Sequence, residues 1–264
     1  MKQRIITAVI AAALFIPFVV YGNLPFTILV YAMAAVGLFE MLRMKGLSIF
    51  SIPGLLGLLA LFTILMPTSW ATQVEETTGF SQLEYVSIFV MLLLIYTVLV
   101  KNKSTFDTIA FILASVFYVG IGFHYFIETR AEGIAYIVFA LVIVWTTDSG
   151  AYFVGRKLGK HKLWPEISPK KTIEGFVGGV VIAVISTLIF QYFAQLDVNL
   201  WILLSVAILA SMIGQLGDLV ESAIKRHYGV KDSGTILPGH GGILDRFDSL
   251  IFVLPLLHFI HFIG

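Results

Sequence analysis

The stretch that decides the fold runs from Ile5 to Phe39 and reads IITAVIAAALFIPFVVYGNLPFTILVYAMAAVGLF, with no charged residue. A bilayer core of about 30 Å needs about 20 apolar residues per helix, so this run is too long for a single span. Its middle is interrupted by Gly22-Asn23-Leu24-Pro25, and glycine and proline mark breaks between helices. We therefore predict two transmembrane helices joined as a hairpin at this break.

The composition of the whole chain agrees with a membrane protein. Of its 264 residues, 58% are hydrophobic and 12% are charged, whereas soluble domains have about 45–50% and about 25%. This excludes an ordinary water-soluble domain and a disordered chain. The absence of cysteine excludes disulfides, thiolate metal sites and cysteine nucleophiles. The net charge of +1 shows no basic excess of the kind that nucleic-acid binding requires.

The charged residues divide the remaining chain into further apolar runs. Beyond the first hairpin these are Gly46–Val74, Tyr85–Val100, Thr108–Ile127, Gly133–Thr147, Gly175–Leu196, Val198–Gly217 and Ser249–Gly264. We therefore predict an all-α, polytopic integral membrane protein with about nine transmembrane helices, forming a single transmembrane domain over residues 1–264.

The distribution of charge predicts the orientation. Cytosolic loops of membrane proteins carry an excess of Lys and Arg. With a cytosolic N-terminus, every Lys and Arg except Arg130 lies on the cytosolic side, and the outer loops carry mainly Glu and Asp. The two large cytosolic loops, 148–174 and 218–248, hold most of the polar residues. We expect residues 1–130 to be mainly scaffold and residues 131–264 to carry the site.

Several carboxylates are predicted to lie at one depth. The run Gly133–Thr147 is too short to cross the hydrocarbon core at ~1.5 Å per residue, so Asp148 falls at the inner boundary. Asp218 ends one long run, and Asp245 and Asp248 precede the last run. The alternative is that these are helix ends that reach the interface, but a short Asp side chain does this poorly compared with Lys or Arg.

Two of these carboxylates belong to pairs with helical spacing. Asp218 and Glu221, and likewise Asp245 and Asp248, are three residues apart and would share a helix face. Mg²⁺ takes one or two carboxylates together with phosphate oxygens and water, and two such pairs suit a two-metal phosphoryl-transfer centre. The alternative is an ion-pair network with nearby bases such as Lys225. We predict Mg²⁺, as two ions, with these four carboxylates as ligands.

Two further segments are suited to phosphate. Ser168, Lys170, Lys171 and Thr172 precede an apolar helix, where hydroxyls, ammonium groups and the helix N-terminus favour an anion; alternatively, the lysines mark the cytosolic end of the span. The loop Pro238–Gly242 includes His240, Gly241 and Gly242, and its backbone can approach phosphates closely. By contrast, Gly175 and Gly179 indicate close helix packing, and we interpret Glu40, which has no evident partner, as structural.

The stretch Ser222–Asp248, SAIKRHYGVKDSGTILPGHGGILDRFD, resembles the signature of the phosphatidate cytidylyltransferase (CDP-diacylglycerol synthase) family. The matching positions are Ser222, Lys225-Arg226, Lys231-Asp232, His240-Gly241-Gly242 and Asp245-Arg246-Phe247-Asp248. The segments Asp148–Tyr152 and Ser168–Gly175 also resemble family motifs. The resemblance covers roughly residues 145–249, whereas the N-terminal half matches only in its hydropathy.

This resemblance implies an enzyme of phospholipid biosynthesis that transfers the cytidylyl group of CTP to phosphatidic acid, giving CDP-diacylglycerol and pyrophosphate, with Mg²⁺. Its partners would be CTP, phosphatidic acid and the lipid bilayer, without nucleic acid, and a homodimer is compatible with the sequence. We expect a bacterial plasma (inner) membrane with the site on the cytosolic side.

The site residues follow as a hypothesis. The catalytic group is Asp218, Asp245, Lys225 and Asp248, and the metal ligands are Asp218, Asp245, Glu221 and Asp248. The substrate-binding group is Ser168, Lys170, Lys171, Thr172, Ser222, Arg226, Lys231, His240, Gly241, Gly242, Arg246 and Asp148. Two rival functions are an ion-coupled transporter, which predicts charges at mid-bilayer and repeat symmetry, and a CTP-dependent lipid kinase.

Overall fold

The computed structural model describes residues 2–264, and it describes side chains from residue 6 onward except at residue 8. The predicted cytosolic N-terminus and the side chains of Lys2 and Arg4, which support it, therefore lie outside the description. The helices are α1 (Lys2–Tyr21), α2 (Asn23–Met44), α3 (Ile52–Ile64), α4 (Thr68–Thr78), α5 (Gln82–Leu99), α6 (Phe106–Glu132), α7 (Ile134–Leu158), α8 (Ile173–Ala194), α9 (Leu200–His227), α10 (Leu244–Phe247) and α11 (Leu250–Phe259). The strands are β1 (Lys162–Trp164) and β2 (Ser168–Thr172).

Six helices of the described chain, α2 and α5 to α9, are long and apolar enough to cross a membrane. The pair α3 and α4 bends by 104° at its break and makes a seventh if it is counted as one span. The apolar part of α1, Val9–Tyr21, and α11 are shorter. The prediction of a helical, polytopic membrane protein is therefore confirmed, while the number nine and the cytosolic N-terminus stay predictions.

The break in the first apolar run lies where the sequence predicts it. Helix α1 ends at Tyr21 and α2 begins at Asn23. Gly22, between the helices, has φ +70°, and Asn23, the first residue of α2, has φ +49°; positive φ favours glycine and is tolerated by asparagine. Because α1 contacts α2, the two helices form the expected hairpin.

The chain divides into two compact units. The first, the N-terminal unit, contains the described residues up to Glu128 together with the distant segment Asp232–Leu244. In it α2 contacts α1 and α3, and α3 contacts α5. The second, the C-terminal unit, contains Thr129–Lys231 and Asp245–Gly264.

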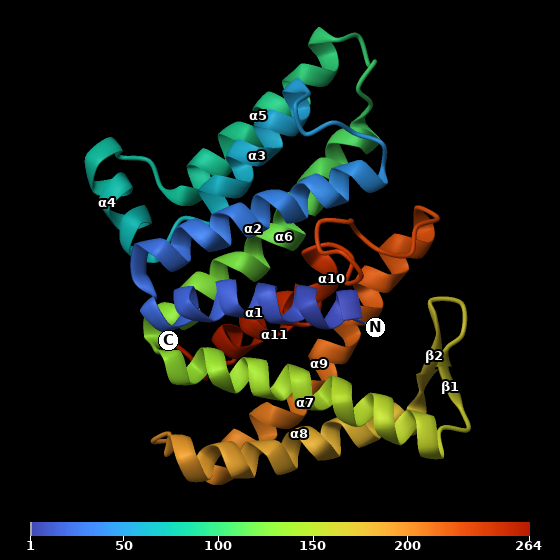
Figure 1. Ribbon diagram of the computed structural model, residues 1–264. Helices are drawn as coiled ribbons and strands as arrows, with labels where there is room; N and C mark the ends of the chain where they lie inside the picture. Colours follow the sequence, from blue (N-terminus) through green and yellow to red (C-terminus); the bar gives the residue numbers. More distant parts are fainter. Residues whose placement is uncertain (1) are drawn as a thin grey trace. The chain divides into compact units, whose positions relative to one another are not determined.

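The C-terminal unit is organised around α7 and α8, which lie side by side (Figure 1). A Cβ on Gly175 would lie 2.8 Å from the carbonyl oxygen of Ala151, and one on Gly179 would lie 2.9 Å from that of Thr147. Only glycine allows the two backbones to approach so closely. The packing role predicted for these glycines is confirmed. Helix α9 contacts both α7 and α8, and α11 contacts α7 and α9.

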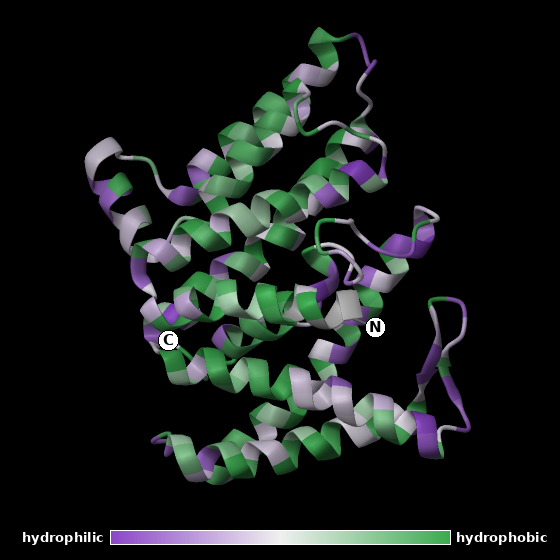
Figure 2. Ribbon diagram, viewed as in Figure 1, coloured by the Kyte–Doolittle hydropathy of each residue, from purple (hydrophilic) through white to green (hydrophobic). Residues whose placement is uncertain are grey.

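The two predicted cytosolic loops, 148–174 and 218–248, are shorter in the structure. Helix α7 continues through Asp148 to Leu158, and α9 continues through Asp218 to His227. The helix can continue past each carboxylate because neighbouring positions such as Gly150 and Leu219 are buried and face the packed side of the helix. What remains of the first loop is an antiparallel hairpin of β1 and β2, a departure from the all-α prediction. Figure 2 shows hydrophilic residues gathered on this hairpin and hydrophobic residues along the helices.

Candidate active site

Helix α9 carries the largest group of predicted site residues. Its last turns place Asp218, Glu221, Ser222 and Lys225 at spacings of three and four residues, which lie next to one another on a helix surface. The Ser222 hydroxyl donates to Asp218 Oδ1 at 3.3 Å. Arg226 instead donates to the carbonyl oxygen of Val230 at 3.0 Å, and so closes the C-terminal end of the helix.

A buried cluster forms around Lys225. Its Nζ donates to Glu221 Oε2 and to Asp245 Oδ1, each at 2.6 Å. The side chains of Lys225, Glu221 and Asp245 are 9%, 0% and 5% exposed. The structure thus brings together two predicted metal ligands and places an ammonium group between them. Glu221 Oε1 is buried and has no hydrogen-bond partner among the described residues, so an acceptor is left over.

A second ammonium group pairs with Asp218. Lys171, on β2, lies 2.6 Å from Asp218 Oδ2, and its Nζ is 3.5 Å from the carbonyl oxygen of Gln215. Both side chains of the pair are about one-third exposed, at 27% and 31%. A partly exposed ion pair adds little to stability. Lys171 and Asp218 are therefore accessible to a ligand.

Asp248 lies between α10 and α11 among other carboxylates. Burial raises its pKa well above the usual range, and the negative charges of Asp218, Glu221 and Asp148 raise it further. Its Oδ1 accepts a hydrogen bond from the backbone N–H of Ser249 at 2.6 Å, which partly offsets this effect. The four carboxylates thus repel one another, and a cation relieves such repulsion.

The carboxylates of Asp218, Glu221, Asp245 and Asp248 fit a hard divalent cation, although they do not form a complete coordination shell among the described residues. Among the described residues, no group of three or more His, Asp or Glu side chains has the spacing of a metal site. Mg²⁺ needs only one or two protein carboxylates and takes its other ligands from water and phosphate. Buried carboxylate oxygens, with one acceptor of Glu221 left over, fit this requirement.

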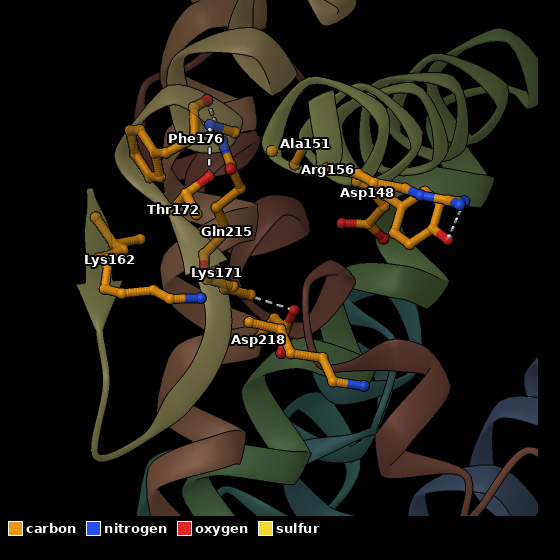
Figure 3. Close-up of a pocket in the computed structure, with 14 residues that line it drawn as sticks. Asp148, Ala151, Arg156, Lys162, Lys171, Thr172, Phe176, Gln215 and Asp218 are labelled. Carbon is orange, nitrogen blue, oxygen red and sulfur yellow. Dashed lines mark hydrogen bonds and ion pairs between the residues drawn. The ribbon is translucent and has the colours of Figure 1, made fainter. Parts of the chain in front are cut away.

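A pocket of about 460 Å³ opens beside Asp218. Five residues proposed from the sequence line it: Asp148, Lys170, Lys171, Thr172 and Asp218. Figure 3 shows Lys171 directed at Asp218, with Asp148 on the facing helix α7. A volume between about 300 and 1,000 Å³ is typical of small-molecule sites. The pocket therefore joins basic and acidic side chains in a space of ligand size.

The pocket also contains residues that sequence reasoning missed. Arg156 and Lys162 add two positive charges, and Tyr152 and Gln215 add polar groups. The Nε2 of Gln215 donates to the carbonyl oxygen of Phe176 at 3.2 Å, which holds the amide in place. The available signal for the two bases was their position in the predicted loop 148–174, beside the other predicted site residues.

The hairpin that carries Lys170 and Lys171 is tied to the start of α8. The Thr172 hydroxyl accepts from the N–H of Gly175 at 3.1 Å and caps this helix. Glu174 accepts from the backbone N–H groups of Lys160 and His161 and lies 2.6 Å from His161 Nδ1. These contacts hold the base of the hairpin, so that its lysines line the pocket. Ser168, at the start of β2, pairs with Trp164 in the hairpin register and does not line it.

The glycine-rich loop belongs to the N-terminal unit. Gly239 and Gly241 have φ of +78° and +88°, and the N–H of His240 donates to the carbonyl oxygen of Leu237 at 2.8 Å. The loop is thus a tight turn that glycine permits. Lys231 and Arg246 are exposed. The ligand roles of His240, Gly241, Gly242, Lys231, Arg226 and Arg246 stay predictions.

Glu40, which we interpret from the sequence as structural, has partners that the sequence does not indicate. It is 2% exposed and accepts hydrogen bonds from Ser233, Ile243 and Leu244. The available signal was a single acid in an otherwise uncharged apolar run. Its partners lie about 200 residues away in the chain, and no local pattern indicates them.

The chain is similar to known proteins over nearly its whole length. Residues 2–263 match the model of a family described as the cytidylyltransferase family. The chain is 58% identical over 263 residues to the phosphatidate cytidylyltransferase of Bacillus subtilis strain 168, covering 98% of this chain and 97% of the relative. It is 53% identical over 261 residues to that of Staphylococcus epidermidis strain ATCC 12228, and 51% identical over 258 residues to that of Staphylococcus aureus strain COL, covering 98% of each chain in both cases.

Proposed function

Because the chain belongs to the cytidylyltransferase family, we propose that it transfers the cytidylyl group of CTP to phosphatidic acid, giving CDP-diacylglycerol and pyrophosphate, with Mg²⁺ as cofactor. The names of the relatives support the two substrates. We place the protein in a bacterial plasma membrane, with its N-terminus and its site on the cytosolic side. This side supplies the soluble nucleotide, and the bilayer supplies the lipid.

The observation that carries the proposal is the pocket beside Asp218. It brings four basic side chains, Arg156, Lys162, Lys170 and Lys171, together with the carboxylates of Asp148 and Asp218. Phosphate oxygens need bases and hydrogen-bond donors. The carboxylates alone would repel phosphate oxygens, so the presence of Asp148 and Asp218 in the pocket supports a cation that accompanies the phosphates.

The reaction needs positioning and charge neutralisation more than covalent chemistry by the protein. An oxygen of the phosphatidate phosphate attacks the α-phosphorus of CTP, the bond between this phosphorus and the bridging oxygen breaks, and pyrophosphate leaves with the electron pair. The lysines of the hairpin would bind phosphate oxygens and orient them in line. Lys171 would exchange its contact with Asp218 for a phosphate when the substrate binds.

The Mg²⁺ ions would be held by Asp218 and Asp245, with Glu221 and Asp248 in support. Bound Mg²⁺ supplies positive charge to the phosphate oxygens and stabilises the pyrophosphate that leaves. Lys225, which lies between Glu221 and Asp245, keeps these buried carboxylates together before the cofactor binds. The protein's own contribution is thus to hold the carboxylates of Glu221 and Asp245 close together despite their mutual repulsion.

The test is cytidylyl transfer by the purified protein in detergent. CTP labelled at the α-phosphate and phosphatidic acid are supplied with Mg²⁺, and labelled CDP-diacylglycerol is expected. Asp218→Asn and Lys171→Gln should each lower turnover at least 100-fold, whereas Lys157→Gln, an exposed lysine outside the pocket, should retain it. Near wild-type turnover of Asp218→Asn at ordinary Mg²⁺ would contradict the metal assignment.

The same assay separates the rival functions. A CTP-dependent lipid kinase would transfer label from the γ-phosphate rather than the α-phosphate. An ion-coupled transporter would move a labelled phosphate compound into proteoliposomes and form no lipid product. The orientation is tested separately: since the chain has no cysteine, a single cysteine at Lys157 should react with an impermeant maleimide only from the cytosolic side.

A further inference from the structure

Glu40 is a buried carboxylate on α2 whose role the transfer reaction does not explain. It is 2% exposed, and the other residues of the run Asn23–Leu42 are uncharged. A buried carboxylate is costly unless it is well hydrogen-bonded. Its partners therefore indicate why an acid stands at this position.

Both oxygens of Glu40 bind the segment Ser233–Leu244 within the N-terminal unit. Oε2 accepts from the Ser233 hydroxyl and from the N–H of Leu244, each at 3.0 Å. Oε1 accepts from the N–H of Ile243 at 2.9 Å. Hydrogen bonds to an ionised acceptor are stronger than those between neutral groups. One carboxylate thus joins the first and last residues of a loop.

Two glycines of the loop are explained by the same carboxylate. A Cβ on Gly234 or on Gly242 would collide with Glu40 Oε1, and at Gly242 also with Ser233 Oγ. The loop backbone is therefore packed directly onto the acid at both ends. Gly242 belongs to the glycine-rich turn that also contains His240. Close packing on Glu40 is thus one reason for a glycine at position 242.

The place of this contact in the chain connects it with the reaction. Leu244, whose N–H is held by Glu40, is followed directly by Asp245. We propose that Glu40 is a positioning residue for cytidylyl transfer: it holds the Ser233–Leu244 loop closed at its base and so sets the backbone that leads into Asp245. This inference rests on the proposed function, in which Asp245 is a catalytic residue.

The principal test is Glu40→Gln, which has nearly the same shape. A glutamine keeps one carbonyl oxygen but replaces the other acceptor by an NH₂ donor, so at least one donor from the loop loses its partner. Hydrogen exchange of the amides in peptides covering residues 232–244 should become about ten- to a hundredfold faster. In the transfer assay kcat should fall at least tenfold, while KM for CTP and for phosphatidic acid changes less than threefold.

Two further variants keep the test decisive. Ser233→Ala removes one donor to Glu40, and it should speed exchange at least threefold and lower kcat by a smaller factor than Glu40→Gln. This variant carries the test if Glu40→Gln does not fold. Thr27→Val is the matched control. Thr27 is a buried polar residue of the same helix whose hydroxyl donates to the carbonyl oxygen of Asn23 within that helix, so exchange in the loop and kcat should stay at wild-type values.

The outcomes separate this inference from the proposed function. Unchanged exchange in Glu40→Gln, or faster exchange with kcat within twofold of wild type, would overturn the role of Glu40. A fall in kcat for Thr27→Val equal to that of Glu40→Gln would also overturn it, since any buried polar change in α2 would then suffice. A wild-type protein that exchanges normally but transfers no cytidylyl group would overturn the proposed function alone.

Discussion

The buried cluster of Lys225, Glu221 and Asp245 allows a quantitative prediction. Replacing Lys225 by Met keeps an unbranched side chain but removes the ammonium group that bonds both carboxylates at 2.6 Å. Because the three side chains are at most 9% exposed, water cannot replace the lost cation. Breaking a buried ion pair by removing one partner costs about 3–5 kcal/mol. For a chain of this size that lowers the melting temperature by about 10 °C.

The assay is thermal unfolding in detergent, followed by tryptophan fluorescence, with a chelator present and no substrate. Lys157→Met, at an exposed lysine of the same unit, is the matched control and should melt within about 2 °C of wild type, as surface substitutions usually do. The double variant Glu221→Gln with Lys225→Met should recover part of the lost melting temperature, because it also removes one of the two carboxylate charges that Lys225→Met leaves unpaired. A Lys225→Met protein that melts with the wild type would refute the reasoning.

Three further predictions concern the same unit. Lys171→Gln should change the melting temperature by less than about 2 °C, because its pair with Asp218 is partly exposed and such pairs contribute about 1 kcal/mol or less, yet it should abolish transfer. Asp248→Asn should be inactive, and at pH 8 in chelator it should melt a few degrees above wild type. The raised pKa of Asp248 favours the uncharged carboxyl in the folded state, so the stability that this group contributes is greatest below pH ~4 and is lost as pH rises through the folded pKa. A melting series from pH 4 to 8 should show the difference in melting temperature between the variant and wild type shrink toward pH 4. Gly175→Val should lower the free energy of unfolding by about 1–3 kcal/mol through overpacking, because a Cβ at this position would lie 2.8 Å from the carbonyl oxygen of Ala151. A variant that melts at the wild-type temperature would contradict the close packing of α7 against α8.

Much of the fold could be predicted because the signals are local. Apolar runs predict membrane helices from composition alone, and the break at Gly22 lies where glycine and proline punctuate the run. The ends of α7 and α9 were missed for a related reason. A charged residue in the sequence predicts the end of a span, whereas in the structure the helix continues past Asp148 and Asp218 with one face buried.

The sequence by itself determined that this is a membrane protein of the cytidylyltransferase family, with its polar chemistry in the second half of the chain. The spacing of four residues on one helix already allows Lys225 to pair with Glu221, the alternative that the sequence left open. Only the tertiary structure decided the pairs between distant segments: Lys225 with Asp245 and Lys171 with Asp218. It also gave Glu40 its partners in a loop about 200 residues away. Hydropathy and helix periodicity act over a few turns of chain, but the pairing of buried charges depends on which side chains the packed helices bring within hydrogen-bond distance, and spacing along the chain does not encode that distance.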